Sequence, residues 1–538
     1  MTGTADTRAF TGFLSTYLDR YRPLHLESSY AWWDANVTGS DEAFARKARA
    51  EAAIIELQSD RAVFADVERF RDAGLDDPVL RRQADVLYRT FLGRQADPGR
   101  QKRIVAIENS IEQTFNTHRS TVDGRSLTEN EVREVLSGSE DSRAVEAAWK
   151  GYMAVGAEVA DRVREVVELR NTIARELGYA NYFAMALDLQ EVDVDALLRL
   201  FDQLDDLTRA PFAALKDALD ARMADRFGLA PAALRPWHFG DLFFQEAIGQ
   251  GESGLDAIFQ DRDLTEVARA YYASLGMPVE AVLARSDLYE RDGKSPHAFA
   301  VDLDRAGDVR ILCNLKPSTR WMDTLLHELG HAVYDVHLDA DLPFVLKEAS
   351  SAITTEGIAM MMGSMAKNGE FLVRGLGVAP SEAARLVAAA RQSLAAEKLI
   401  FSRWAQVVVR FEHAMYAGHD GDLGALWWEL KQRYQLLPPP DRLAPDYAAK
   451  VHIAVYPAYY QSYVMGDLFG TQLRHHLAET VAGGADPAAT CFYDRTEAGA
   501  YLRDAVFALG NRHPWHELTE RCTGSPLSAE AFASLYVS

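Results

Sequence analysis

The fold is decided by residues 324–333, which read TLLHELGHAV. This stretch is half apolar with helical spacing, so we expect a helix with one buried face. Residues four apart share one face of a helix, which allows His327 and His331 to present two imidazoles to a single metal ion. Glu328 lies one residue round the helix, where it can take a proton from a metal-bound water without being a ligand. The motif predicts a catalytic site with one Zn²⁺ ion; the alternative is a surface helix that carries two histidines.

A catalytic zinc has three protein ligands and one open position, so a third ligand must lie elsewhere in the chain. His337 completes a longer histidine spacing, but Tyr334 stands where that spacing needs a glycine, and we expect His337 to be a solvated helix residue. Glu348 fits no known spacing. Glu356 lies in an apolar segment, residues 349–362, that predicts a second buried helix. Because a buried carboxylate needs a partner, we favour Glu356 as the third ligand.

Gly330 is an unusual residue for the interior of the predicted zinc helix. Glycine there costs about 1 kcal/mol relative to alanine. Close packing beside the metal would explain why the chain has it.

Most of the chain outside this motif reads as helix. Thr128 and Glu131 have the form of a capping box that opens one of these helices. Two β-prone runs, residues 299–303 and 309–315, predict a hairpin that ends shortly before the zinc motif. We therefore expect an all-α protein with a small β-hairpin near the active site. Helical periodicity is found in residues 43–59, 145–177, 194–227, 380–411 and 422–434.

The composition narrows the possible partners and compartments. The 538 residues include 57 Lys+Arg and 79 Asp+Glu, so 57 − 79 gives a net charge of −22, which argues against nucleic-acid binding. The N-terminus shows no signal-peptide pattern, and no run of about 18 apolar residues predicts a membrane span. Three cysteines without metal-site spacing suit a reducing compartment. We expect a cytoplasmic protein without membrane or nucleic-acid partners; the sequence leaves the oligomeric state open.

At this point the sequence resembles the angiotensin-converting enzyme family of zinc dipeptidyl carboxypeptidases. His327, Glu328, His331 and Glu356 match the zinc ligands and catalytic glutamate of that family. The resemblance implies one catalytic unit over residues 1–538, built of two helical lobes around a deep central cleft. Besides the zinc motif, it rests on Tyr30–Thr38 (YAWWDANVT), Ala148–Tyr152 (AWKGY), Leu177–Tyr179, Glu497–Gly499 and Pro514–Trp515.

The same resemblance assigns substrate-binding residues. His297 and Ala298 match a pair that binds the substrate backbone, and a strand edge beside the zinc suits an extended peptide. Lys450 matches a lysine that pairs with the C-terminal carboxylate of the peptide, and Gln245 matches a glutamine that shares it. A charged donor beside a neutral amide suits a carboxylate. Taken alone, Lys450 and Gln245 read equally well as surface residues, and His297 as a turn histidine.

Four tyrosines lie within residues 456–463, and the resemblance divides them. Tyr460 and Tyr463 have the spacing of two family tyrosines, so the resemblance implies that Tyr460 binds the carboxylate and Tyr463 the oxyanion. His452 matches a histidine that donates to the substrate or transition-state oxygen. Tyr456 and Tyr459 are expected to be packing residues.

These observations predict a zinc metallopeptidase that releases C-terminal dipeptides from short peptides. The zinc would polarise the scissile carbonyl and acidify a water, and Glu328 would move the proton to the leaving amine. A zinc-binding scaffold without catalysis is disfavoured, because Glu328 would have no purpose in it. Two catalytic alternatives keep the same zinc site. One is a cytoplasmic endo-oligopeptidase of the thimet type without the carboxylate anchor; the other is a related fold that performs different zinc chemistry on a small amide or amino-acid metabolite.

Overall fold

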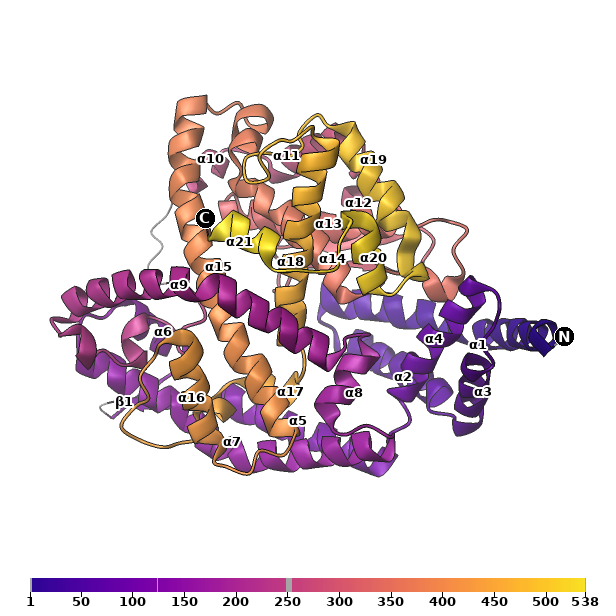
Figure 1. Ribbon diagram of the computed structural model, residues 1–538, viewed down its shortest axis with the longest axis horizontal. Coiled ribbons are helices and arrows are strands. Elements are labelled where there is room, and N and C mark those ends of the chain that lie inside the picture. Colours follow the sequence, from indigo (N-terminus) through magenta and orange to yellow (C-terminus); the bar gives the residue numbers. More distant parts are fainter. Residues whose placement is uncertain (1, 123, 248–253, 538) are drawn as a thin grey trace. The chain divides into compact units, whose positions relative to one another are not determined.

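Helices make up most of the chain in the computed structural model, which describes residues 2–122, 124–247 and 254–537 (Figure 1). Within those residues the only strands form two antiparallel hairpins, β1 (Ser120–Val122) with β2 (Arg125–Leu127) and β3 (Phe299–Asp302) with β4 (Val309–Leu312). The predicted all-α class with a small β-hairpin is confirmed. The single catalytic unit with a central cleft between two lobes stays a prediction.

Residue contacts divide the chain into two compact units, with boundaries inside α15 (Pro380–Tyr416) and α18 (Tyr460–His476). Unit 1 comprises Met1–Gln95, Glu252–Ala390 and Met465–Leu527. Besides parts of α15 and α18, its helices are α1 (Thr2–Thr38), α2 (Asp41–Gln58), α3 (Arg61–Asp72), α4 (Pro78–Leu92), α10 (Asp256–Phe259), α11 (Leu264–Ser274), α12 (Glu280–Arg285), α13 (Thr319–Val336), α14 (Ala352–Gly363), α19 (Thr496–Ala505) and α20 (Trp515–Thr523).

Unit 2 comprises Ala96–Gly251, Arg391–Val464 and Ser528–Ser538. Its core includes Phe212, Phe244 and Ile400, which are buried together. Besides parts of α15 and α18, its helices are α5 (Pro98–Thr117), α6 (Glu129–Gly138), α7 (Ser142–Glu176), α8 (Tyr182–Leu189), α9 (Val194–Phe227), α16 (Leu423–Gln435), α17 (Val451–Val455) and α21 (Glu530–Tyr536).

Helix ends follow local capping chemistry. Asp193 accepts the backbone N–H of Ala196 at the start of α9, and Gly228 ends that helix at a φ of +63°. The observed bounds of α9 are therefore the same as those predicted from periodicity. Thr128 and Glu131 form the predicted capping box of α6. The other predicted helices correspond to α2, α7, α15 and α16, with ends that differ by a few residues.

The β3–β4 hairpin packs against α13 in unit 1. Its register pairs Phe299 with Leu312 and Asp302 with Val309. On α1, Trp32 packs its ring on Phe299 with a centroid separation of 4.3 Å. In the described chain, β3 has a ladder partner on one side only. An extended peptide could therefore add to its other edge.

Candidate active site

Helix α13 carries His327, Glu328 and His331. It begins after Ser318, whose hydroxyl accepts the backbone N–H of Trp321. One apolar face of α13 is buried, which fixes the rotation of the helix and the direction of its histidines. Its buried residues include Met322, Leu325, Leu326, Leu329, Ala332 and Val333. The neighbouring helix in unit 1, α14, carries Glu356 and lies beside α13 (Figure 1).

Glycines allow α13 and α14 to approach closely. A Cβ atom on Gly330 would lie 2.9 Å from the Cα of Ala359, so any side chain there would collide with the backbone of α14. Similarly, a Cβ on Gly363 would lie 2.6 Å from Asp323 Oδ1 and 3.3 Å from His327 Cβ. The interpretation of Gly330 as a close-packing residue is thus confirmed.

We call His327, His331 and Glu356 the metal triad, because their donor atoms converge. One donor atom from each lies within 4.8 Å of the others. Glu356 Oε2 is 3.6 Å from His327 Nε2 and 3.9 Å from His331 Nε2. His331 Nδ1 is 2.7 Å from the hydroxyl of Thr355; with the proton on Nδ1, this hydrogen bond leaves the lone pair of Nε2 for a metal.

The electrostatics of the metal triad suit a divalent cation. Burial, followed by repulsion from His327, lowers the pKa of His331 to about 3, which keeps the imidazole neutral as a ligand must be. Burial also raises the pKa of Glu356. Glu328 is buried, and burial together with the charge of Glu356 raises its pKa to about 8. Two imidazoles and one carboxylate fit zinc. The raised pKa makes Glu328 a stronger base, and the charge of a bound cation would ionise it for the role of proton acceptor.

The two other third-ligand candidates lie outside the metal triad. His337 is half-buried at the C-terminal end of α13, and its Nδ1 donates to the carbonyl of Val333 at 2.8 Å. Glu348 Oε2 accepts from Arg305 Nη2 at 2.6 Å. The geometry therefore brings Glu356 to the two histidines, as predicted, and His337 is less exposed than expected.

His297 and Ala298 lie directly before β3 in unit 1. The backbone N–H of His297 donates to the hydroxyl of Ser295 at 3.3 Å, and the side chain of His297 is exposed. This position suits the predicted contact with a substrate backbone; the role itself stays a prediction.

The other predicted site residues lie together in unit 2. Lys450 Nζ donates to Gln245 Oε1 at 2.9 Å. Aromatic rings surround the ammonium group, with centroids at 5.1 Å for Phe243, 5.6 Å for Trp404 and 5.6 Å for Tyr460. We call these five residues the Lys450 pocket. Burial lowers the pKa of Lys450 to about 8, although the charge of Asp241 opposes this shift.

One buried nitrogen beside Lys450, Nδ1 of His452, lacks a hydrogen-bond partner in the described parts of the chain. Burial, followed by repulsion from Lys450, lowers the pKa of His452 to about 4, so the ring is neutral at neutral pH. With its proton on Nδ1, the unpaired His452 ring beside a buried cation suits an anionic ligand.

The predicted tyrosines divide differently from the expectation. Tyr460 is buried and packs on His452 and Tyr463, with ring centroids 5.2 and 5.8 Å apart. Tyr456 and Tyr459, expected to be packing residues, are instead 50% and 40% exposed. The expectation failed because aromatic residues at helical spacing do not reveal which of them face solvent.

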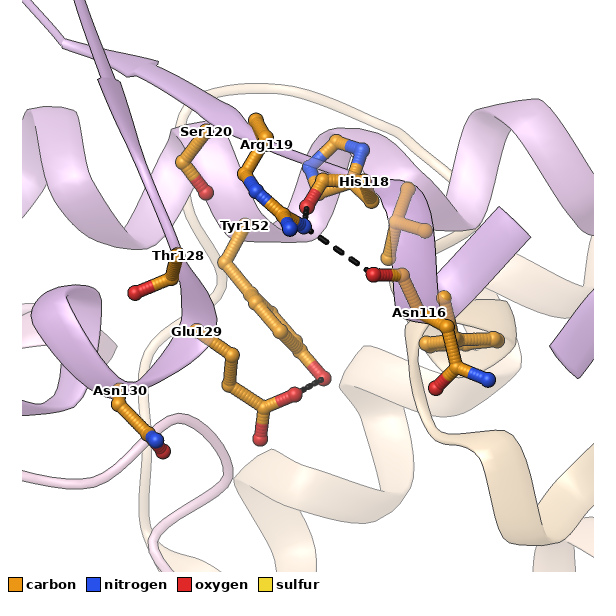
Figure 2. A pocket seen from close by; sticks show the side chains of 10 residues that line it. Asn116, His118, Arg119, Ser120, Thr128, Glu129, Asn130 and Tyr152 are labelled. Carbon is orange, nitrogen blue, oxygen red and sulfur yellow. Dashed lines mark hydrogen bonds between the residues drawn. The ribbon is translucent and has the colours of Figure 1, made fainter. Parts of the chain in front are cut away.

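A polar pocket of about 400 Å³ in unit 2 contains none of the predicted site residues (Figure 2). In Figure 2 the hydroxyl of Tyr152 meets the carboxylate of Glu129, 3.4 Å away, and Arg119 turns back toward the Asn116 carbonyl. Two stretches with a sequence signal reach it: the capping box at Thr128 and the AWKGY segment at Tyr152. Its lining residues are Phe115, Asn116, His118, Arg119, Ser120, Thr128, Glu129, Asn130, Tyr152 and Val155.

A mostly helical protein with two histidines on one helix and a glutamate on the next defines a zinc-metallopeptidase class of site. The sequence model of a family described as angiotensin-converting enzyme matches residues 4–229 and 255–537. The angiotensin-converting enzyme of Theromyzon tessulatum is 20% identical over an alignment of 564 residues, which covers 97% of this chain and 90% of that protein. The chain belongs to the angiotensin-converting enzyme family, whose members are zinc-dependent metallopeptidases.

No helix in the described ranges is both long and apolar enough to cross a membrane. The three cysteines, Cys313, Cys491 and Cys522, are free and buried.

Proposed function

We propose that the protein hydrolyses short peptides and releases C-terminal dipeptides, with one zinc ion held by the metal triad. One observation carries the dipeptide part. Lys450 is buried, its ammonium donates to the neutral Gln245 amide, and no carboxylate of the described residues lies within ion-pair distance of it. A buried cation without a partner is costly, and a peptide with a free C-terminal carboxylate supplies that partner.

The chemistry follows from the donor set. Bound zinc would supply a Lewis acid for the scissile carbonyl and lower the pKa of a water. Glu328 takes the proton of the attacking water and delivers it to the leaving amine. Tyr463 and His452 donate hydrogen bonds to the oxyanion as its charge develops. The neutral His452 ring carries one N–H for this purpose.

Binding requires both ends of the cleaved segment to be held. The open edge of β3, with His297 and Ala298 before it, holds the peptide extended by main-chain hydrogen bonds. Lys450, Gln245 and Tyr460 hold the C-terminal carboxylate. The product length of two residues is carried over from the resemblance to the family, in which this carboxylate anchor accompanies the zinc site.

We also place the protein in the cytoplasm. The three free, buried thiols support a reducing compartment, where glutathione and thioredoxin keep cysteines unpaired.

A digest of peptides in free and C-terminally amidated form, read by mass spectrometry, tests the proposal. We expect dipeptides from the free forms, little cleavage of the amides and no cleavage after chelation of zinc. Equal cleavage of both forms would instead support an endo-oligopeptidase. No hydrolysis by protein that holds one zinc would support other zinc chemistry. Glu328→Gln should bind zinc and lose hydrolysis; full activity in that variant would refute the proton-transfer role.

A further inference from the structure

Gln245 ends a loop, residues 240–245, whose backbone conformation is strained. Phe244 has a φ of +54°, in the left-handed region. That conformation costs a non-glycine residue about 1–2 kcal/mol, so it persists only where neighbouring groups hold it. The loop thus depends on its contacts to keep Gln245 beside Lys450.

Helix α16 holds the carbonyl side of this loop. Lys431 Nζ donates to the carbonyl of Phe243 at 2.9 Å and to Gln435 Oε1 at 2.7 Å. Gln435 Nε2 in turn donates to the carbonyls of Phe243 and Phe244 at 3.3 and 2.6 Å. Lys431 and Gln435 therefore fix the carbonyls of the strained residue and of the one before it.

Other groups of unit 2 hold the rest of the loop. Asp241 is buried, and its Oδ2 accepts the backbone N–H of Gln245 at 2.7 Å. Trp149 Nε1 donates to the carbonyl of Leu242 at 2.9 Å. Arg133 lies 3.5 Å from Asp241 Oδ1 and pairs with Glu129, which links the loop to the polar pocket of Figure 2.

Lys431 brings a charge that a purely structural contact would not need. It is 2% exposed, and no carboxylate in the described ranges of the chain lies within ion-pair distance of its ammonium. Burial lowers its pKa to about 7; Asp241 and Asp446 oppose that shift, and Lys450 adds to it. A neutral amide could hold a carbonyl without this desolvation cost.

Lys431 and Lys450 lie around the same aromatic ring. Their ammonium groups are 5.0 and 5.6 Å from the ring centroid of Trp404. Two cations without hydrogen-bonded carboxylates repel one another, and an anion bound at Lys450 would offset the charge of both. The second buried cation thus favours binding of an anion in the Lys450 pocket.

We propose that Lys431 is a positioning residue for the C-terminal carboxylate of the substrate. It fixes the Phe243 carbonyl, and with it the loop that presents Gln245, and its charge adds to that of Lys450. This inference rests on the proposed function, because it requires the Lys450 pocket to bind a carboxylate.

Calorimetric titration of the zinc-loaded protein with the dipeptide Ala-Ala, as free acid and as C-terminal amide, tests the carboxylate anchor and the role of Lys431 separately. We expect wild-type protein to bind the acid at least about tenfold more tightly than the amide. In Lys431→Met the acid should lose about tenfold in affinity and the amide should be unaffected. Lys431→Arg, which keeps the charge and donors, should restore most of the preference. In peptide hydrolysis, Lys431→Met should raise KM for free peptides and leave kcat within about twofold.

Lys216 offers a matched control, since it is a second buried lysine of unit 2, paired with Asp220 at 2.6 Å. Lys216→Met should leave the preference for the acid unchanged. If wild-type protein binds acid and amide equally, the carboxylate anchor of the proposed function fails. If wild-type protein prefers the acid and Lys431→Met keeps that preference, the role of Lys431 alone is refuted. Equal losses on both ligands would show a merely structural residue and would also overturn the inference.

Discussion

The metal triad of unit 1 and the Lys450 pocket of unit 2 bury side chains of opposite charge. The metal triad gathers electron-pair donors: its carboxylate oxygen lies 3.6 and 3.9 Å from two imidazole nitrogens. The Lys450 pocket gathers hydrogen-bond donors around an ammonium group and contains no carboxylate. The first suits a cation and the second an anion.

Burial acts on both regions in the same sense. It raises the pKa of Glu356 and lowers the pKa of Lys450, so in each region the charged form is disfavoured until a ligand of opposite sign binds. The described part of the chain therefore leaves the charges of Glu356 and Lys450 without a partner. Zinc would supply that partner for Glu356, and a substrate with a free carboxylate would supply it for Lys450. Each of the following predictions separates one region from the other.

The largest effect is expected from Glu356→Gln, which removes the only carboxylate of the metal triad. Loss of a partner that merely orients a zinc ligand costs about 10–100-fold in metal affinity, so loss of the ligand itself should exceed about 100-fold. Zinc content after dialysis in metal-buffered solution, measured by mass spectrometry, should fall below one ion per chain. Hydrolysis should fall with it, and binding of a dipeptide acid to the Lys450 pocket should change less.

Glu348→Gln is the control, because Glu348 pairs with Arg305 in the same unit. That variant should keep its zinc. If Glu348→Gln lost zinc and Glu356→Gln kept it, Glu348 would be the third zinc ligand in place of Glu356.

The metal triad could be predicted from the sequence because two of its three residues are close together along the chain. His327 and His331 are four residues apart on one helix, and the apolar pattern fixed which face they share. Glu356 followed from a second apolar segment that became α14. The β3–β4 hairpin likewise followed from residue types and a short turn.

The surroundings of the Lys450 pocket could not be predicted in the same way. The contact of Lys431 with the Phe243 carbonyl joins residues 188 positions apart, and the left-handed Phe244 has no sequence signal because the residue is not glycine. Trp404 reads as an ordinary helix residue. Resemblance to a family supplied Lys450, Gln245 and Tyr460, but not the hydrogen bonds that hold them.

A smaller effect is expected from Gly330→Ala, which tests the close packing of the metal triad. The new Cβ would lie 2.9 Å from the Cα of Ala359, so α13 and α14 must separate. Such overpacking costs about 1–3 kcal/mol, which outweighs the roughly 1 kcal/mol that alanine gains in a helix. We expect a lower unfolding midpoint in urea and weaker zinc binding, because the histidines move relative to Glu356.

Gly12→Ala in α1 is the matched control for this change. Gly12 lies in a helix of the same unit, and no atom lies within 4 Å of its added Cβ. The unfolding midpoint should rise, since alanine stabilises an exposed helix by about 0.5–1 kcal/mol over glycine. If both substitutions stabilise the protein, the close approach at Gly330 is not a constraint.

The smallest effect is the pH dependence of the Lys450 pocket. Lys450, with a pKa of about 8, is a cation below that pH and loses its charge as the pH rises through it, and Lys431 does so from about pH 7. The substrate carboxylate is ionised throughout this range. The preference for a dipeptide acid over its amide should therefore be flat below pH 7, weaken above it, and fall up to about tenfold per pH unit above pH 8.

Titration of Glu328 affects binding of the acid and of the amide alike, so the ratio of the two affinities reports on the lysines alone. Lys450→Met should abolish both the preference for the acid and its dependence on pH. Lys431→Met should remove the part of the pH dependence that begins near pH 7. A wild-type ratio of acid to amide affinity that stays constant from pH 6 to pH 9.5 would contradict carboxylate binding by these cations.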